Sequence, residues 1–241
     1  MRAGEGWEAD ADDWTRWARE PDLDAYWRFN RDAFFELVPA AGARTLDAGC
    51  GEGRVARDLA ARGHRVVGVD LSPTLVRVAA ESDPDGEYLV ADATALPFAA
   101  GSFDLVVAFN SLMNVRDVGA AVREAARVLT PGGRLCVCVT HPLNDAGAFA
   151  AEEADAPYVV ARSYFERRDL EETREEEGLR FTFRGRTRTL EDYARALEDA
   201  GLLVEALREP VPGDAAAARW PRLGRWRRIP MFLHLRALKP G

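Results

Sequence analysis

The sequence predicts an α/β fold: a doubly wound, Rossmann-like sheet of seven mostly parallel strands, with the last strand antiparallel and helices on both faces. The first indication is an apolar run that closes at Leu46 and leads into a glycine-rich loop and then a helical period. The second is Asp70, which ends another apolar run roughly 20 residues further on, where such sheets place a carboxylate. The third is Phe103–Phe109, which is apolar at almost every position, as a central strand buried on both faces should be.

The remaining elements of this sheet follow in order along the chain. Ser72 and Pro73 form a helix start, with serine as N-cap and proline at the first helical position. Thr189 caps a later helix, with Asp192 three residues on, and that helix ends at Gly201. The other expected elements are a helix at 117–129 and strands at 87–91, 135–139, 202–207 and 231–238, with a Pro-Gly-Gly turn before the strand at 135.

The chain begins with a segment that does not belong to the sheet pattern. Residues 1–40 are acidic and rich in aromatic side chains. We expect them to form an N-terminal helical cap, with helices near 11–18 and 23–37 that are broken at Pro21. Residues 41–241 then form the main domain.

The main domain carries a long insertion at 141–188. It contains two β-like runs, Tyr158–Phe165 and Leu179–Arg184, which are separated by the charged run Glu166–Glu177. This order predicts a flap resembling a β-hairpin, in which the charged run is a solvated connection and aromatic side chains on one face are able to cover a substrate.

Composition narrows the class of protein. The 241 residues carry a net charge of −8, which argues against a broad surface for polyanions, so nucleic acid is not the expected partner. Three cysteines in motif or strand positions imply neither a disulfide framework nor a metal site. No apolar run approaches the length of a membrane span, and the N-terminus lacks the apolar core of a signal peptide. We therefore expect a soluble, cytoplasmic protein that does not interact with membranes.

The spacing of the glycine loop argues against a dinucleotide. A G-x-G-x-x-G fingerprint that starts at Gly49 needs a glycine at position 54, where this chain has Arg54. Asp47 and Glu52 carry the same sign of charge as a pyrophosphate, whereas they would attract a ligand with positive groups. The loop therefore favours a cationic nucleoside over a dinucleotide such as NAD.

Four motifs, in a characteristic order, resemble the class I S-adenosylmethionine-dependent methyltransferases. They read LDAGCGEGR at the first loop, VDLS after the second strand, VADATALPFAAGSFDLVVAFNSL through the third loop and fourth strand, and VLTPGGRLCVCV into the fifth strand. The resemblance is dense from Ala43 to Val139 and looser from Thr189 to Lys239. It implies an S-adenosylmethionine cofactor.

The resemblance also implies a role for each cofactor-binding residue. Asp47, Gly49 and Gly51 would line the methionine part of the cofactor, and Asp70 would bind the ribose hydroxyls. The adenine would be packed by Leu71, would donate from its amine to Asp92 and would accept from the Ala93 amide, and Phe109 completes the expected cofactor site.

The expected reaction is methyl transfer to a small-molecule acceptor by in-line displacement, which mainly requires alignment and exclusion of water. We expect substrate contacts from five residues, namely Tyr26, Trp27, Asn30, Asn110 and Tyr164. His141 is the best candidate for a general base, because it follows the fifth strand at the edge where such sheets bind ligands. Its alternative role is a structural residue before Pro142. The alternative function is a catalytically inactive cofactor-binding or regulatory protein on the same fold.

Overall fold

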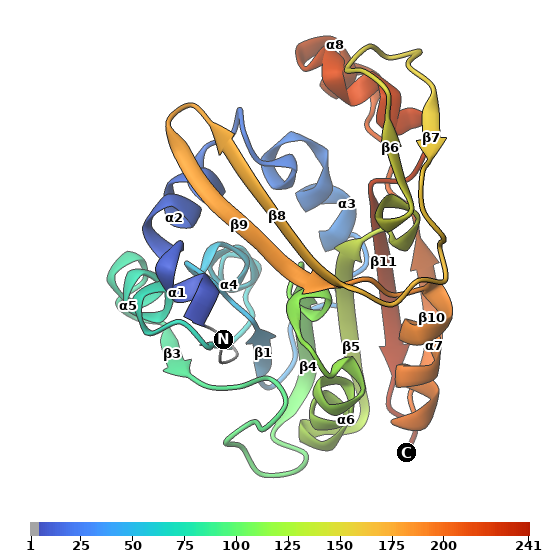
Figure 1. Ribbon diagram of the computed structural model, residues 1–241. Helices are drawn as coiled ribbons and strands as arrows, with labels where there is room; N and C mark the ends of the chain where they lie inside the picture. The colour runs from blue at the N-terminus through green and yellow to red at the C-terminus, as the bar shows by residue number, and fades with distance from the viewer. Residues whose placement is uncertain (1–4) are drawn as a thin grey trace.

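The seven-stranded sheet predicted from the sequence is present in the computed structural model, which describes residues 5–241 (Figure 1). Its strand order is β3-β2-β1-β4-β5-β11-β10, and β11 is antiparallel to both of its neighbours while the pairs from β3 to β5 are parallel. The strands are β1 (Thr45–Ala48), β2 (Val66–Asp70), β3 (Glu87–Val90), β4 (Phe103–Phe109), β5 (Leu129–Thr140), β10 (Leu203–Arg208) and β11 (Phe232–Leu238). The predicted topology is therefore confirmed.

Helices cover both faces of this sheet, as a doubly wound fold requires. The apolar sides of α6 (Val118–Val128) and α7 (Leu190–Asp199) pack on one face, and α4 (Arg54–Ala60) and α3 (Arg31–Phe35) pack on the other. The predicted caps form: the Ser72 hydroxyl accepts from the Leu75 amide at 3.1 Å at the start of α5 (Pro73–Ser82), and Thr189 and Asp192 make a capping box. Local sequence signals thus position the starts of α5 and α7.

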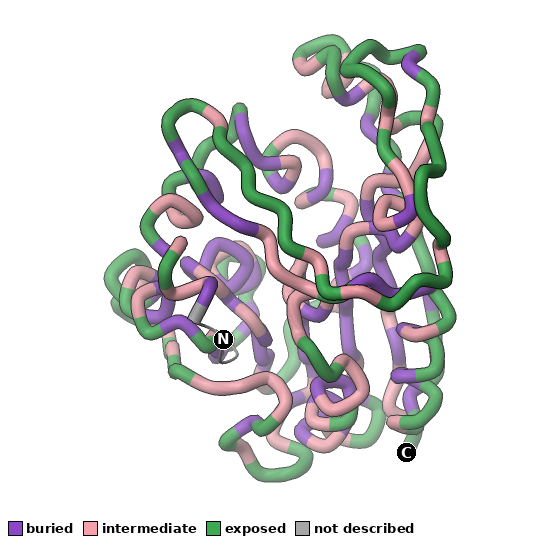
Figure 2. The backbone as a smooth tube through the Cα atoms, in the orientation of Figure 1, coloured by how far each residue is buried: buried purple, intermediate pink, exposed green. Residues whose placement is uncertain are grey.

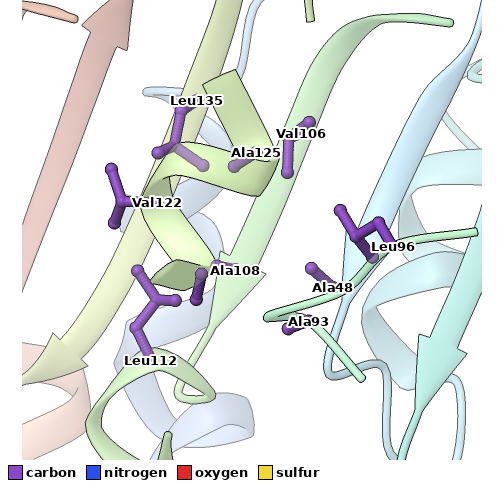
Figure 3. Close-up of a pocket in the computed structure, with 10 residues that line it drawn as sticks. Ala48, Ala93, Leu96, Val106, Ala108, Leu112, Val122, Ala125 and Leu135 are labelled. Carbon is purple, nitrogen blue, oxygen red and sulfur yellow. The ribbon is translucent and has the colours of Figure 1, made fainter. Parts of the chain in front are cut away.

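A small void lies inside the core between α6 and the sheet (Figure 3). Its volume is only about 10 Å³, close to the size of one water molecule, and its wall is entirely apolar. The side chains that line it include Val106, Leu112, Val122 and Leu135. It is a packing defect and has no room for a substrate.

The N-terminal segment is helical but differs in detail from the prediction. Helix α2 (Ala11–Arg19) matches the expected first helix, while the second consists of a π-helical turn, η1 (Tyr26–Asn30), that continues into α3. An additional short helix, α1 (Glu5–Ala9), precedes them, and the first four residues of the predicted cap lie outside the described residues. Helix α1 contacts both α5 and β9, so this segment crosses from one side of the ligand edge to the other.

The insertion contains a hairpin, but the strand pairing predicted for it is wrong. The charged run is itself a strand, β8 (Asp169–Glu176), and it pairs with β9 (Leu179–Arg186), whereas β7 (Tyr158–Val160) pairs with β6 (Gly147–Phe149). Strand β8 tolerates charged side chains because it is exposed along most of its length, while β9 is partly buried (Figure 2). The hairpin therefore has one solvated strand and one packed strand.

The second small hairpin builds an arm at the top of the molecule in Figure 1. Strands β6 and β7 lie beside α8 (Asp214–Arg219) and η4 (Pro221–Arg227). Arginines of the basic loop hold this arm together: Arg225 donates to the Ala151 carbonyl, Arg228 donates to the Ala156 carbonyl, and Arg222 pairs with Glu152. These side chains are used internally, which gives them a structural role.

Candidate functional site

A cavity of about 660 Å³ lies at the carboxyl ends of β1, β2 and β4. This is the edge at which open α/β sheets bind ligands, and the volume is in the usual range of roughly 300–1,000 Å³ for small-molecule sites. Its floor is formed by the loops that follow these strands and its roof by α1, α2 and the β8–β9 hairpin. Eight of the fourteen site residues predicted from the sequence line it: Gly49, Gly51, Asp70, Leu71, Asp92, Ala93, Phe109 and Asn110.

The glycine loop forms the part of the floor next to β1. Gly49 has a φ of +80°, and a Cβ on it would lie 2.4 Å from Cβ of Ser111. Gly53 has a φ of +85° at the start of α4, and a Cβ there would lie 2.9 Å from Cβ of Ala79 on α5. Both positions therefore require glycine, the first for the cavity floor and the second for close packing of two helices.

Asp70 is held with both carboxylate oxygens oriented at the end of β2. Oδ2 accepts from the Gly51 amide at 2.9 Å and Oδ1 accepts from the Ser72 amide at 2.9 Å. The carboxylate lines the cavity, and burial raises its pKa above the ordinary range while the backbone hydrogen bonds oppose this effect. Each oxygen keeps a further lone pair, so the carboxylate is oriented to accept two hydroxyl groups.

Asp47 lies beneath the glycine loop and does not line the cavity. Its side chain is completely buried, and neither carboxylate oxygen has a hydrogen-bond partner within residues 5–241. Burial, and secondarily the charge of Asp70, raises the pKa of Asp47 to about 7. An unpartnered buried carboxylate is costly, so this site is poised to be stabilised by a nearby positive charge.

The Asp47→Asn variant is expected to gain stability relative to the wild type as pH rises. Because the folded-state pKa exceeds the unfolded value, native Asp47 keeps a proton that the unfolded chain loses, and wild-type stability falls between about pH 4 and pH 7. Three pKa units correspond to an upper bound of about 4 kcal/mol. Urea unfolding of both proteins at pH 5 and pH 8 measures this difference, and an equal difference at the two pH values would contradict it.

Two further loops complete the side of the cavity next to Asp70. Asp92 follows β3, and its Oδ1 accepts from the amide and the hydroxyl of Thr94 at 2.8 and 2.7 Å, which leaves Oδ2 for a ligand. Leu71 is 36% exposed beside Asp70, although it is a large apolar residue, so it presents a flat apolar contact. Phe109 lines the opposite wall at the end of β4, packed edge-on against Tyr26 and Phe34.

The roof contributes residues that the sequence analysis did not single out as site residues. Trp7, Trp14 and Phe183 line the cavity, with Trp14 packed edge-on against the other two rings. The Trp14 indole Nε1 lies only 3.6 Å from the position of a Cβ on Gly51, so this nitrogen is directly above the glycine loop. In the sequence, the many aromatic residues of the N-terminal segment were the signal for an aromatic roof. That signal did not show which rings line the cavity and which pack in the core.

Acidic side chains fasten the roof to the rest of the molecule. Glu8 accepts from the amide and hydroxyl of Thr74 and pairs with the Ser72 hydroxyl, and these hydrogen bonds lower the pKa of Glu8. Asp10 accepts from the Thr182 amide at 3.1 Å and pairs with Arg184 at 2.6 Å. Helix α1 is therefore tied to α5 at one side of the cavity and to β9 at the other.

Among the five residues expected to contact substrate, the structure brings Asn110 to the cavity. Tyr26 and Asn30 are buried behind its wall, where the Tyr26 hydroxyl donates to Asp58 at 2.5 Å and Asn30 contacts Cys138 and His234. Trp27 donates from Nε1 to the Ala18 carbonyl. Tyr164 accepts from the Leu190 amide at 2.8 Å at the base of the hairpin. These four side chains are outside the cavity lining and support the elements that form it.

His141 is also outside the cavity lining, with both ring nitrogens occupied. Its Nδ1 accepts from the Leu143 amide at 3.2 Å, and its Nε2 lies 3.0 Å from a carboxylate oxygen of Glu209. An Nδ1 that accepts leaves the proton on Nε2, which donates to Glu209. Burial lowers the pKa of His141 against the opposing effect of Glu209. The neutral ring has no free lone pair, and it begins the turn η3 (Pro142–Asp145).

The two carboxylates expected to attract a positive ligand differ, because Asp47 has no hydrogen-bond partner within residues 5–241 whereas Glu52 is paired with arginines. Glu52 is 1% exposed and is neutralised by Arg57 at 2.8 Å and Arg19 at 2.9 Å. Arg54 is likewise buried, pairs with Asp24 at 2.6 Å and lies 4.5 Å from the centre of the Tyr26 ring. These pairs join the loop to the N-terminal helices, so the charges serve the roof.

Within the described part of the chain, no group of three or more histidine, cysteine, aspartate or glutamate side chains is arranged to hold a metal ion. Of the helices in residues 5–241, none combines the length and the apolar character that crossing a membrane demands.

Comparisons with known proteins agree with this geometry. Residues 46–137 match a family model described as a methyltransferase domain. The chain is 41% identical over 115 residues to a demethylmenaquinone methyltransferase of Beutenbergia cavernae, covering 48% of this chain and 47% of the relative. It is 38% identical over 125 residues to a ubiquinone biosynthesis O-methyltransferase of Xanthomonas oryzae, covering 50% and 52%. The chain thus spans about half the length of the curated relatives it matches.

A solved structure extends the similarity over nearly the whole chain. An S-adenosylmethionine-dependent methyltransferase from Mesorhizobium loti superposes with a TM-score of 0.73 at 28% identity, covering 91% of this chain and all of that one. The sheet order, the glycine loop and the carboxylate after β2 are the features that the sequence motifs had indicated. Residues 46–137 therefore form a methyltransferase domain, and the fold and motifs of the chain are consistent with the class I S-adenosylmethionine-dependent methyltransferases.

Proposed function

We propose that this protein transfers the methyl group of S-adenosylmethionine to an oxygen-bearing aromatic small molecule. The observation that carries the proposal is the composition of a single cavity. One half is formed by the glycine loop, Asp70 and Asp92, and the other half by roof residues that include the aromatic rings of Trp7 and Phe183 as well as charged side chains such as Arg186. The names of the two quinone-pathway relatives favour a phenolic or quinol acceptor.

The polar half fits the cofactor in charge as well as in shape. Asp70 offers two oriented oxygens to the ribose hydroxyls, and Asp92 keeps Oδ2 for the adenine amine. The unpartnered carboxylate of Asp47 stabilises a positive ligand above it. When bound, S-adenosylmethionine supplies a methyl group on a sulfonium centre, whose departing sulfur keeps the electron pair as a neutral thioether.

The protein's own contribution is to align the acceptor and to exclude water. In-line displacement needs the attacking atom close to the methyl carbon and opposite the sulfur, and fixing that geometry supplies much of the rate enhancement. The aromatic rings of the roof supply apolar surface, and Asn110, which follows β4, supplies a polar contact on the cavity wall. No base is required for an acceptor that binds as its phenolate.

His141→Ala is therefore expected to retain turnover within about threefold of the wild type. Its two hydrogen bonds are worth roughly 0.5–1.5 kcal/mol each, so the main effect is a lower stability of the turn after β5. Turnover at neutral pH and the urea midpoint measure the two effects separately. A loss of about a hundredfold in turnover that shrinks as pH rises would restore His141 as a general base.

Trp14→Phe is expected to weaken S-adenosylhomocysteine about tenfold and to leave 5′-methylthioadenosine unchanged. The variant keeps an aromatic ring, although a smaller one, and removes Nε1–H, which lies above Gly51 and would donate to the amino-acid carboxylate that methylthioadenosine lacks. Calorimetric titration of both ligands into the wild type and the variant measures the four affinities that this comparison needs. Equal weakening of the two ligands would show that the ring, rather than the N–H group, provides the contact.

The function is tested with a panel of acceptors in the presence of S-adenosylmethionine. The panel contains phenols, catechols and naphthoquinols, with matched anilines and carboxylic acids, and S-adenosylhomocysteine formation is measured. We expect turnover with one or more oxygen-bearing aromatics. Turnover only with anilines would overturn the acceptor class, while cofactor binding without turnover on any compound would favour an inactive binding protein.

A further inference from the structure

Behind Asn110, three polar side chains form a buried chain through the core. The Cys138 thiol lies 3.2 Å from Oδ1 of Asn110, Nδ2 of Asn30 lies 3.5 Å from Cys138 Sγ, and Nε2 of His234 lies 2.7 Å from Asn30 Oδ1. Asn30, Cys138 and His234 are each 0% exposed, and none of them lines the cavity. Buried polar groups are costly unless they are paired, so this chain across β4, β5, β11 and η1 calls for an explanation.

The direction of the hydrogen bonds follows from His234. Burial lowers its pKa to about 4, so the ring is neutral. Its Nδ1 has no partner within residues 5–241, and a buried orphan acceptor is more readily tolerated than an orphan N–H. The proton is therefore on Nε2, which donates to Asn30 Oδ1. Asn30 Nδ2 then donates to Cys138 Sγ, and the Cys138 thiol donates to Asn110 Oδ1.

Hydrogen bonds within residues 5–241 engage every polar atom of Asn110 except one. Its backbone amide donates to the Cys138 carbonyl at 2.8 Å, and its carbonyl accepts from Asn114 Nδ2 at 3.0 Å. Its φ is +51°, a left-handed conformation that is uncommon for any residue but glycine and that asparagine tolerates better than most. Strained positions of this kind cluster at functional sites. Only the side-chain Nδ2 remains, on a residue that lines the cavity.

We propose that Asn110 donates a hydrogen bond from Nδ2 to an oxyanion of the acceptor, and that Cys138, Asn30 and His234 are positioning residues that hold it in that orientation. This inference rests on the proposed function and specifies the acceptor atom of that same site. An oxygen acceptor must shed its proton before or during methyl transfer, and His141 is turned to Glu209. A fixed donor instead favours the ionised acceptor, because hydrogen bonds to charged groups are the stronger ones.

The alternative orientation makes the opposite prediction. If the hydrogen bonds ran in the reverse direction, Asn110 Oδ1 would face the cavity and would accept a hydrogen bond from a neutral hydroxyl or amine of the acceptor. Asn110→Asp then distinguishes the two, since a carboxylate accepts but does not donate. Under our assignment this variant repels an oxyanion, whereas under the reverse assignment it preserves the contact.

The first experiment examines positioning without any acceptor. In protein saturated with S-adenosylhomocysteine and labelled with ¹⁵N-asparagine, the side-chain amide signals of Asn110 are those that vanish in Asn110→Asp. We expect Cys138→Ser, which keeps a donor, to leave this pair sharp, and Cys138→Ala to shift or broaden it. Cys136→Ala is the matched control, because Cys136 is equally buried on β5 but its thiol faces the Leu37 carbonyl. An Asn110 signal unaffected by Cys138→Ala would overturn the positioning role.

The second experiment measures ionisation of a bound probe, 4-nitrophenol, whose phenolate form absorbs visible light. In the protein loaded with S-adenosylhomocysteine, we expect Asn110→Ala to lower the ratio of phenolate to phenol in the bound probe about tenfold. Asn110→Asp should lower it further, Cys138→Ala should lower it in part, and Cys138→Ser and Cys136→Ala should match the wild type. An unchanged ratio in Asn110→Ala, or no binding of the probe to the wild type, would overturn the proposal.

The two proposals fail separately. A ratio that depends on Asn110 while the acceptor panel gives no turnover would leave the oxyanion contact standing and would contradict methyl transfer. Turnover on phenols, with a phenolate-to-phenol ratio that does not depend on Asn110, would support methyl transfer and would contradict the oxyanion contact. Because the Asn110 variants change a residue at the cavity wall, their result does not depend on whether Cys138→Ala folds.

Discussion

Replacing Asp70 by alanine is expected to weaken the binding of S-adenosylhomocysteine by at least about a hundredfold. The variant removes two charge-assisted hydrogen bonds to the ribose, at roughly 1.5–3 kcal/mol each, and the lower bound of the sum is about 3 kcal/mol. It also releases the amides of Gly51 and Ser72, which Asp70 holds at 2.9 Å in the folded protein. Isothermal titration measures the change.

The matched control for this experiment is Asp58→Ala. Asp58 is also a half-buried carboxylate, with Arg31 at 2.5 Å and the Tyr26 hydroxyl at 2.5 Å, but it lies outside the cavity lining. We expect Asp58→Ala to lower stability while cofactor affinity stays within about threefold. A folded Asp70→Ala protein with wild-type affinity would place the ribose elsewhere in the cavity.

The floor of the site was predictable because local sequence determines it. Glycines at Gly49 and Gly53 adopt positive φ angles, and Ser72 caps α5 three residues before the amide that it binds. Asp70 reaches Gly51 because parallel strands end at a common edge. Each of these features depends on a strand, a turn and a helix start that follow one another within about 30 residues.

The roof was not predictable from the same signals, because its contacts join distant parts of the chain. Asp10 meets Thr182, and Asp13 accepts from the Arg180 amide, so the open edge of β9 is covered by α2. Charged side chains along β8 concealed its strand character. The turn between β8 and β9 has φ angles of +52° at Glu177 and +77° at Gly178, as both central residues of a type I′ hairpin turn do. In the sequence, Gly178 was the signal for this turn.

His141 illustrates the same limit on the catalytic side. Its position at the end of β5 was predicted correctly, but the orientation of its ring depends on Glu209 and Leu143. Chain position identified the edge of the sheet, whereas the packing of separate segments decided whether the side chain faces the cavity. For Asn110, by contrast, local chain position was enough to place it at the cavity, since its backbone continues directly from a strand of the floor.

Removing the β8–β9 hairpin is expected to abolish methyl transfer while the sheet and the cofactor floor remain folded. The ends of the hairpin are close together, because the Thr187 amide donates to the Arg168 carbonyl at 2.9 Å, so a short Gly/Ser bridge can replace residues 169–186. The deletion removes Phe183 from the cavity wall and exposes the acceptor half to water. It also removes the packing of Phe181 against Trp17, whose ring centre lies 4.8 Å from that of Phe181.

Cofactor affinity is expected to fall much less, by about tenfold. Asp70, Asp92 and the glycine loop are untouched, and the loss reflects looser packing of α2 and of Trp14 above Gly51. Arg180→Ala is the control within the hairpin, because in residues 5–241 this exposed side chain pairs only with the equally exposed Glu175, while its backbone amide keeps the bond to Asp13. Turnover of the best acceptor from the panel and titration with S-adenosylhomocysteine report the two halves separately. Near-normal turnover in the deletion variant would mean that the floor alone holds the acceptor.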